Sequence, residues 1–166
     1  MDARRAFDGI NRSCLWFKMQ QVGIQGGILT ALQSLYDGVE CCVRINGAMS
    51  DWFPVNNGLK QGCSISPTLF AIYVNDLAQE INNLGLGINI GNTTASILLF
   101  ADDIALIADS EAKLQTMLDT LYQWCRKWRL SLNMTKTKIV HYRNDKTPRS
   151  QFKFTFGPED VDYVSK

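Results

Sequence analysis

Histidines, paired cysteines and long apolar runs are scarce or absent in this sequence. His141 is the only histidine, and the five cysteines show neither CxxC pairs nor the Cys/His spacing of a zinc site. An odd number of unpatterned cysteines also argues against a disulfide framework and favours a reduced, intracellular compartment. No apolar run approaches the ~20 residues that span a bilayer, and the N-terminus has no signal-like apolar core. We therefore expect an intracellular domain without a structural zinc ion or a membrane partner.

Repeats, low-complexity tracts and linker-like stretches are also absent. A chain of 166 residues with 46% hydrophobic content is large enough for one ordinary globular domain with a core. We treat residues 1–166 as that single domain.

The net charge of +1 conceals an uneven distribution of charge. The segment 126–153 contains one acid, Asp145, and nine of the 17 lysines and arginines: Arg126, Lys127, Arg129, Lys136, Lys138, Arg143, Lys146, Arg149 and Lys153. Such a cluster is either a solvated face or a contact for nucleic-acid phosphates, and charge alone leaves both interpretations open.

Hydrophobic spacing predicts helices and strands in alternation. Helical periodicity ends at Gly23 and again at Gly38, and Asn46-Gly47 predicts the turn of a hairpin. Ser66 is expected to cap a third helix that has Pro67 at its first position and runs to about Asn82.

The second half of the sequence predicts one more helix and further strands. Ser110 is expected to begin a long helix whose apolar stripe ends at Trp128, and strands are expected at 138–142 and around Phe152, Phe154 and Phe156. The fold class is therefore predicted to be α+β, with helices packed on one face of an antiparallel sheet.

The stretch SILLFADDIALIADS, residues 96–110, places Asp102 and Asp103 between two apolar runs. The pattern predicts a hairpin packed on both faces, with the two acids in a two-residue β-turn at its tip. Aspartates in a turn are often merely structural, but adjacent carboxylates repel each other unless a cation neutralises them. Mg²⁺ is bound in this way by one or two carboxylates together with substrate phosphates. The stretch therefore suggests a phosphoryl-transfer site that needs one more carboxylate.

Four stretches, in order, resemble the motifs of one family. They are DARRAFDGINR, GLKQGCSISPTLFAIYVNDL, LLFADDIAL and WRLSLNMTKTKIV. They are similar to the first acidic motif, the glycine loop with its helix, the metal-binding hairpin and the lysine motif of the reverse transcriptase palm domain. The likeness is strongest to the enzymes of non-LTR (LINE-like) retrotransposons. The resemblance implies an RNA-directed DNA polymerase that uses an RNA template, a DNA primer and deoxynucleoside triphosphates.

The resemblance also supplies the third carboxylate, Asp2. It implies that Asp2 and Asp102 are the principal ligands of two Mg²⁺ ions, or of Mn²⁺ in their place, with Asp103 in support. Asp8 lies in the same motif, but its spacing to Asn11 suits a helix N-cap, and we expect that structural role.

Three residues of the first motif would lie near the nucleotide. The resemblance places Arg5 and Ala6 where the backbone approaches the triphosphate. Phe7 matches the aromatic steric gate that rejects a ribose 2′-hydroxyl, although packing in the core is the alternative role for a phenylalanine at this position.

The remaining site residues come from the glycine loop and the lysine motif. Gly62 would allow close backbone approach, and Gln61 would offer its amide to the nascent base pair or the template. Lys136 matches the lysine near the pyrophosphate leaving group, where a cation or general acid would help, or else it is one solvated charge among several.

The resemblance covers a palm without its neighbours. The sequence has no fingers segment before Asp2 and stops at EDVDYVSK, where a primer-gripping hairpin and thumb would begin. Two functions are therefore carried forward: a nucleotidyltransferase of retroelement origin, and an inactive remnant that binds nucleic acid or nothing.

Overall fold

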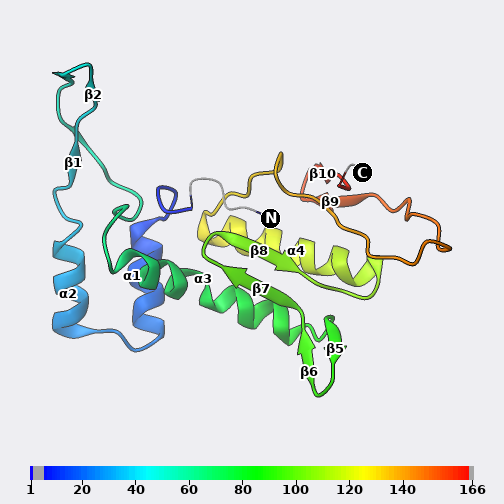
Figure 1. Ribbon diagram of the computed structural model, residues 1–166. Coiled ribbons are helices and arrows are strands. Elements are labelled where there is room, and N and C mark those ends of the chain that lie inside the picture. Colours follow the sequence, from blue (N-terminus) through cyan, green and yellow to red (C-terminus); the bar gives the residue numbers. More distant parts are fainter. Residues whose placement is uncertain (2–5, 165–166) are drawn as a thin grey trace. The chain divides into compact units, whose positions relative to one another are not determined.

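The computed structural model describes Met1 and residues 6–164, which divide into two compact units (Figure 1). One unit is formed by residues 7–73, and the other by Met1, Ala6 and residues 74–164. The boundary falls inside one helix, α3 (Ser66–Asn83), between Tyr73 and Val74.

The 7–73 unit consists of two helices, two short ribbons and the start of α3. Its elements are α1 (Arg12–Gln21), α2 (Gly26–Ser34), β1 (Glu40–Cys41), β2 (Arg44–Ile45), β3 (Ala48–Met49) and β4 (Phe53–Pro54). β1 pairs with β4 and β2 with β3, both antiparallel. The predicted hairpin is confirmed, because Asn46 and Gly47 join β2 to β3 with φ angles of 50° and 87°, the left-handed backbone that such a tight turn requires.

The start of α1 differs from the prediction. The N-cap is Asn11, whose side chain accepts a hydrogen bond from the Cys14 amide at 3.0 Å. The expectation that Asp8 caps this helix is therefore wrong, because Asp8 lies one turn too early in the chain.

The 74–164 unit contains the rest of α3, one long helix and three hairpins. Its other elements are β5 (Ile88–Ile90), β6 (Thr93–Ala95), β7 (Ile97–Phe100), β8 (Asp103–Leu106), α4 (Glu111–Trp128), β9 (Phe154–Phe156) and β10 (Glu159–Val161). Ser110 caps α4 as predicted, accepting from the Lys113 amide at 3.4 Å. The apolar stripe of α4 is buried at Met117, Leu121, Trp124 and Trp128.

The strands form separate antiparallel pairs. In the described part of the chain, β5–β6, β7–β8 and β9–β10 each form a two-stranded sheet, as do the pairs of the 7–73 unit. The α+β class is confirmed, but the single antiparallel sheet covered by helices is not what these residues form. None of the helices described is long and apolar enough to cross a membrane.

The strand expected at 138–142 is reduced to a single bridge. Ile139 pairs with Tyr163 in parallel fashion: its amide donates to the Asp162 carbonyl at 2.8 Å, and its carbonyl accepts from the Val164 amide at 3.0 Å. Ile139 is buried but Val140 and Tyr142 are exposed. This segment therefore contributes one buried side chain, not a strand with an apolar face.

Candidate active site

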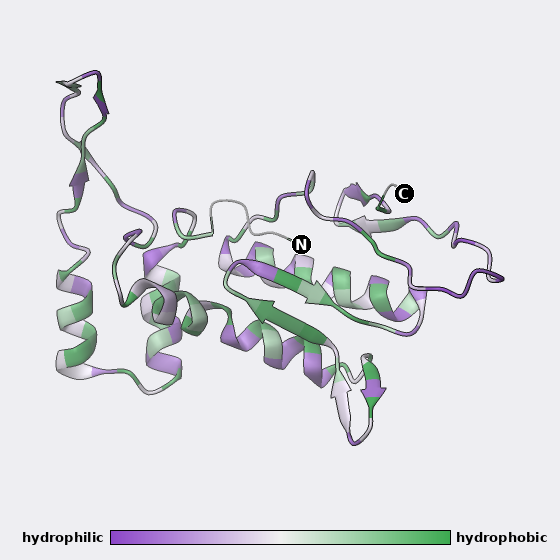
Figure 2. Ribbon diagram, in the orientation of Figure 1, coloured by the Kyte–Doolittle hydropathy of each residue, from purple (hydrophilic) through white to green (hydrophobic). Residues whose placement is uncertain are grey.

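The acidic pair lies at the end of an apolar hairpin. β7 and β8 pair in the register Phe100 with Asp103, so the two-residue connection consists of Ala101 and Asp102. Figure 2 shows β7 mainly green and β8 purple at its beginning. Asp103 is the first residue of β8. The prediction that Asp102 and Asp103 both occupy the turn is therefore wrong by one residue.

This register requires unusual backbone at Ala101. Its φ is 49°, in the left-handed region that residues with a Cβ seldom adopt. A two-residue hairpin connection needs such angles, and the pairing of the apolar strands fixes where the connection falls.

Both carboxylates are accessible. Asp102 is half-buried and Asp103 is exposed, while the next residue, Ile104, is buried and anchors β8. Within the described residues, no lysine, arginine or histidine forms an ion pair with either aspartate. Among the described residues, the negative charge of the hairpin is therefore not engaged in a salt bridge.

The hairpin is not packed on both faces, contrary to the expectation. Leu98 and Phe100 of β7 are 57% and 83% exposed, whereas Ile104 on β8 is 4% exposed. Side chains alternate between the two faces of a strand, so the face that carries Leu98 and Phe100 is the one left open.

Met1 lies beside the hairpin. Its amino group donates to the Ile104 carbonyl and its carbonyl accepts from the Ile104 amide, both at 2.8 Å. Asp2 and Arg5 lie outside the described residues, so their predicted roles stay predictions. The residue that precedes Asp2 is nevertheless paired with the residue that follows Asp103.

The remaining members of the first motif are part of the packed structure. Ala6 is 5% exposed. The ring of Phe7 is half-buried and stacks on that of Phe70, with centroids 5.3 Å apart and planes at 21°. This contact gives Phe7 a packing role and leaves the predicted gate role untested.

The glycine loop carries both residues predicted for it. Gly62 has a φ of 81°, which favours glycine, and open space where a Cβ would be. Gln61 is exposed, and its Nε2 donates to Asp8 Oδ1 at 2.8 Å. The structure thus brings Gln61 together with Asp8, a residue to which the sequence assigned only a capping role.

Backbone pairing joins this loop to the first motif. The Gly58 amide donates to the Ile10 carbonyl and the Leu59 amide to the Phe7 carbonyl, each at 2.8 Å. Gly58 has a φ of 86°, and a Cβ there would meet the Cα and carbonyl oxygen of Asp8 at 2.9 Å. Only glycine suits both the backbone angle and the close approach.

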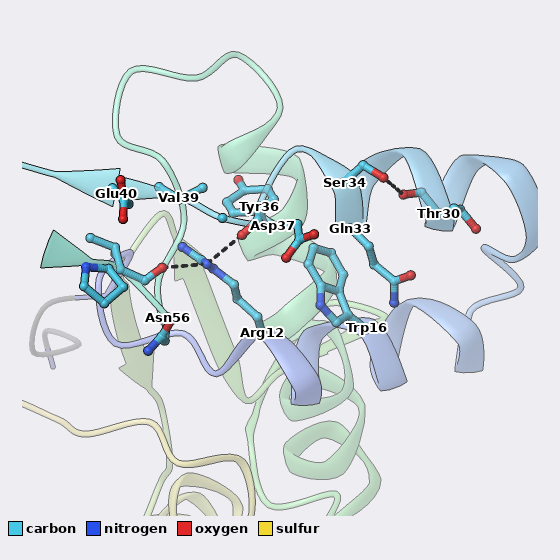
Figure 3. A pocket seen from close by; sticks show the side chains of 13 residues that line it. Arg12, Trp16, Thr30, Gln33, Ser34, Tyr36, Asp37, Val39, Glu40 and Asn56 are labelled. Atoms are coloured by element: carbon cyan, nitrogen blue, oxygen red, sulfur yellow. Dashed lines mark hydrogen bonds between the residues drawn. The ribbon is translucent and has the colours of Figure 1, made fainter. Parts of the chain in front are cut away.

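Arg12 is a structural residue that sequence reasoning missed. Its guanidinium donates to four backbone carbonyls, those of Tyr36, Val55, Asn57 and Gly58, at 2.8 to 3.2 Å. Figure 3 shows the side chain reaching from α1 toward Tyr36, with dashed lines for its hydrogen bonds to the carbonyls of Tyr36 and Val55, the residue after β4. Burial lowers its pKa, and interaction with Tyr36 acts in the opposite direction. No sequence motif marks such a residue, because its partners are main-chain atoms from distant segments.

Lys136 is exposed in a turn of the 74–164 unit, where its amide donates to the Asn133 carbonyl at 3.1 Å. Its predicted position near the leaving group is not tested by this contact. Asp102, Asp103 and Lys136 thus belong to one unit, and Phe7, Gln61 and Gly62 to the other.

A set of three or more acidic, cysteine or histidine side chains that could hold a metal is not found among the described residues. The two aspartates of the hairpin nevertheless provide oxygen donors of the kind that a hard divalent cation prefers. The third predicted ligand, Asp2, lies outside the described residues.

Comparison with known proteins identifies similar sequences. Residues 1–163 match the family model described as reverse transcriptase (RNA-dependent DNA polymerase). A Pol polyprotein from the R2 retrotransposable element of Popillia japonica is 30% identical over 142 residues, which is 84% of this chain and 20% of that protein. The R2DM polyprotein of Drosophila melanogaster is 28% identical, covering 84% of this chain and 13% of its own length.

A polymerase of a different element is similarly related. The RNA-directed DNA polymerase from the mobile element jockey of Drosophila funebris is 27% identical over 150 residues, which is 87% of this chain and 16% of that protein. The chain therefore spans about a fifth or less of the length of these three relatives.

Proposed function

The chain belongs to the reverse transcriptase (RNA-dependent DNA polymerase) family, and we propose that it forms the palm part of an RNA-directed DNA polymerase of the non-LTR retrotransposon kind. In this role it would extend a DNA primer on an RNA template with deoxynucleoside triphosphates. The observation that carries the proposal is the hairpin of β7 and β8, which presents Asp102 and Asp103 without a cationic partner among the described side chains.

The hairpin is suited to a divalent cation. Two adjacent carboxylates repel each other, and a hard cation with oxygen ligands offsets that repulsion. We assign Asp2, Asp102 and Asp103 as the ligands of Mg²⁺, with Mn²⁺ as a substitute. When bound, two such ions supply activation of the primer 3′-hydroxyl and neutralisation of the triphosphate.

The protein's own residues would position the reactants. Gln61 and Gly62 would contact the nascent base pair, and Phe7 would lie against the sugar, where an aromatic ring rejects a 2′-hydroxyl. Arg5 and Ala6 would approach the triphosphate, and Lys136 would assist departure of the pyrophosphate. Holding reactants in near-attack geometry contributes much of the rate acceleration in phosphoryl transfer.

The basic segment 126–153 would contact nucleic acid with part of its charge. Lys138 forms an ion pair with Asp162 at 3.0 Å, and the guanidinium groups of Arg143 and Arg149 donate to main-chain carbonyls. These groups are partly engaged within the protein. Arg126 and Lys127, exposed in the last turn of α4, lie over the rings of Tyr122 and Trp128, which leaves their N–H groups available, and we expect them to contact phosphates.

The test is primer extension by a polymerase that contains residues 1–166, with Asp102→Asn and the matched control Asp119→Asn. Asp119 is exposed on α4 and accepts a hydrogen bond from Gln115, which asparagine can also accept. We expect template-dependent synthesis that is lost in Asp102→Asn and retained in Asp119→Asn. Absence of synthesis by the unmodified protein would favour the alternative, an inactive remnant of a reverse transcriptase.

A further inference from the structure

Two exposed side chains from distant parts of the chain meet in the 7–73 unit. Gln61 Nε2 donates to Asp8 Oδ1 at 2.8 Å, although 53 residues separate them in sequence. Both residues are exposed, so the contact buries little surface. Solvent-exposed polar pairs add little to folding stability, so stability alone is a weak explanation for this one.

The backbone that carries the Asp8 carboxylate is fixed by contacts with neighbouring segments. The carbonyl of Phe7, just before Asp8, accepts from the Leu59 amide, and the backbone of Asp8 itself lies against Gly58. Asp8 and Gly58 lie where the first motif meets the glycine loop, and Arg12 stabilises this junction by donating to the Gly58 carbonyl at 2.9 Å. These contacts hold the backbone of Asp8 in place next to the glycine loop.

Gln61, by contrast, lies in a turn. Residues 61 and 62 belong to no helix or strand, and a glutamine side chain has several rotatable bonds. The hydrogen bond to Asp8 restricts those bonds. A side chain ordered before its ligand arrives loses less conformational entropy on binding.

The chemistry of the pair also decides which atoms remain available. An ionised carboxylate only accepts hydrogen bonds, so the Gln61 amide must turn its NH₂ group toward Asp8. Its Oε1 and its second N–H then remain for a ligand. A freely rotating glutamine would present donor and acceptor in either order.

We propose that Asp8 is a positioning residue that orients the Gln61 amide for recognition of the incoming deoxynucleotide. The ligand class, a nucleotide at the polymerase site, rests on the proposed function. The orientation of Gln61 by Asp8 does not, because it follows from the contact itself.

The first arm of the test measures that orientation in residues 1–166. The side-chain NH₂ signals of Gln61 are followed by NMR, with the exposed Gln20 as an internal reference. In the unmodified chain we expect a Gln61 proton shifted downfield and exchanging slowly. Asp8→Ala should move it to the position of Gln20, and Asp8→Asn, which keeps an acceptor, should restore it in part. A Gln61 signal that Asp8→Ala leaves unchanged would overturn the proposal.

The second arm measures deoxynucleotide use by a polymerase that contains residues 1–166. We expect Asp8→Ala and Gln61→Ala each to raise the KM for the deoxynucleotide by about fivefold, with little effect on the melting temperature, and the double variant to be no worse than either alone. Asp51→Ala, which removes an exposed carboxylate elsewhere in the same unit, should leave the KM unchanged. Additive effects of the two substitutions would overturn the proposal. If the unmodified polymerase extends no primer, the proposed function fails, and the NMR arm still decides whether Asp8 orients Gln61.

Discussion

The backbone of Met1 is paired with that of Ile104. The Met1 amino group donates to the Ile104 carbonyl and the Ile104 amide donates to the Met1 carbonyl, both at 2.8 Å, in the pattern of a hydrogen-bonded antiparallel pair. The pair connects the beginning of the chain to the strand that carries Asp103. It supports the assignment of Asp2 to the same site as the hairpin carboxylates, since Asp2 follows Met1 directly.

Substitution of Gly58 tests the junction between the first motif and the glycine loop. Gly58→Ala should lower the free energy of unfolding by about 2–4 kcal/mol, because the left-handed backbone and the 2.9 Å approach to Asp8 both exclude a Cβ. Urea unfolding measures this. Gly27→Ala is the control: Gly27 lies in α2 with open space around it, so that variant should be stabilised by about 0.5–1 kcal/mol. Equal stability of the two variants would contradict the described junction.

Replacing Arg12 should loosen the same junction from the other side. Arg12→Ala removes four hydrogen bonds to main-chain carbonyls, and we expect a loss of about 2–4 kcal/mol in unfolding free energy. Arg12→Lys should recover little of it, because an ammonium cannot reproduce the planar fork of donors. Hydrogen exchange provides a local readout: the amides of Gly58 and Leu59 should exchange faster in both variants. Full protection of these amides in Arg12→Lys would show that charge, not geometry, is what the site requires.

Cys125 should make stability depend on pH in the alkaline range. Burial raises the pKa of its thiol to about 12 from an ordinary 9.0. A raised pKa in the folded state gives a stabilisation that is complete below about pH 9 and is lost as the pH rises toward 12. The unfolded chain releases its proton first, with a slope approaching ~1.4 kcal/mol per pH unit. Urea unfolding from pH 7 to 10.5 should therefore show a steeper decline for the unmodified chain than for Cys125→Ala. Parallel curves would mean that Cys125 titrates normally.

The sequence predicts the local elements of this protein better than their assembly. Asn46-Gly47 and Ser110 act through their immediate neighbours, so the hairpin and the helix that they predict are found. Which strands pair is not encoded in local periodicity, so the sequence predicts one sheet where the described residues form separate two-stranded ribbons. Hydrophobic alternation likewise did not reveal that Ile139 pairs through a single bridge.

In the candidate site, too, local features could be predicted from the sequence and long-range contacts could not. Family motifs identified Asp102 and Gln61, and spacing alone suggested that Asp8 caps a helix. The actual partner of Asp8 is 53 residues away, and Arg12 binds carbonyl groups that have no signature in the sequence. Side-chain contacts with distant main-chain atoms are invisible to periodicity and motif spacing, and the structure is needed to find them.

Substitution of Phe7 distinguishes a packing role of this side chain from a role in sugar selection. Phe7→Ala should reduce stability because it removes the stack on Phe70, and in a polymerase that contains residues 1–166 it should also admit ribonucleotides. Phe70→Ala removes the same stack and serves as the control. We expect it to lose stability while keeping the preference for deoxynucleotides. Unchanged sugar discrimination in Phe7→Ala would assign Phe7 to the core alone.

Paramagnetic Mn²⁺ provides the most direct test of the central claim, that Asp2, Asp102 and Asp103 share one divalent-metal site. Residues 1–166 are titrated with Mn²⁺ while the broadening of each backbone amide signal is recorded by NMR. We expect the amides of residues 101–104 to broaden first, Asp102→Asn and Asp2→Asn each to suppress this broadening, and Asp119→Asn to leave it unchanged. Broadening centred elsewhere, or broadening of these amides that persists in either Asp102→Asn or Asp2→Asn, would contradict the shared site.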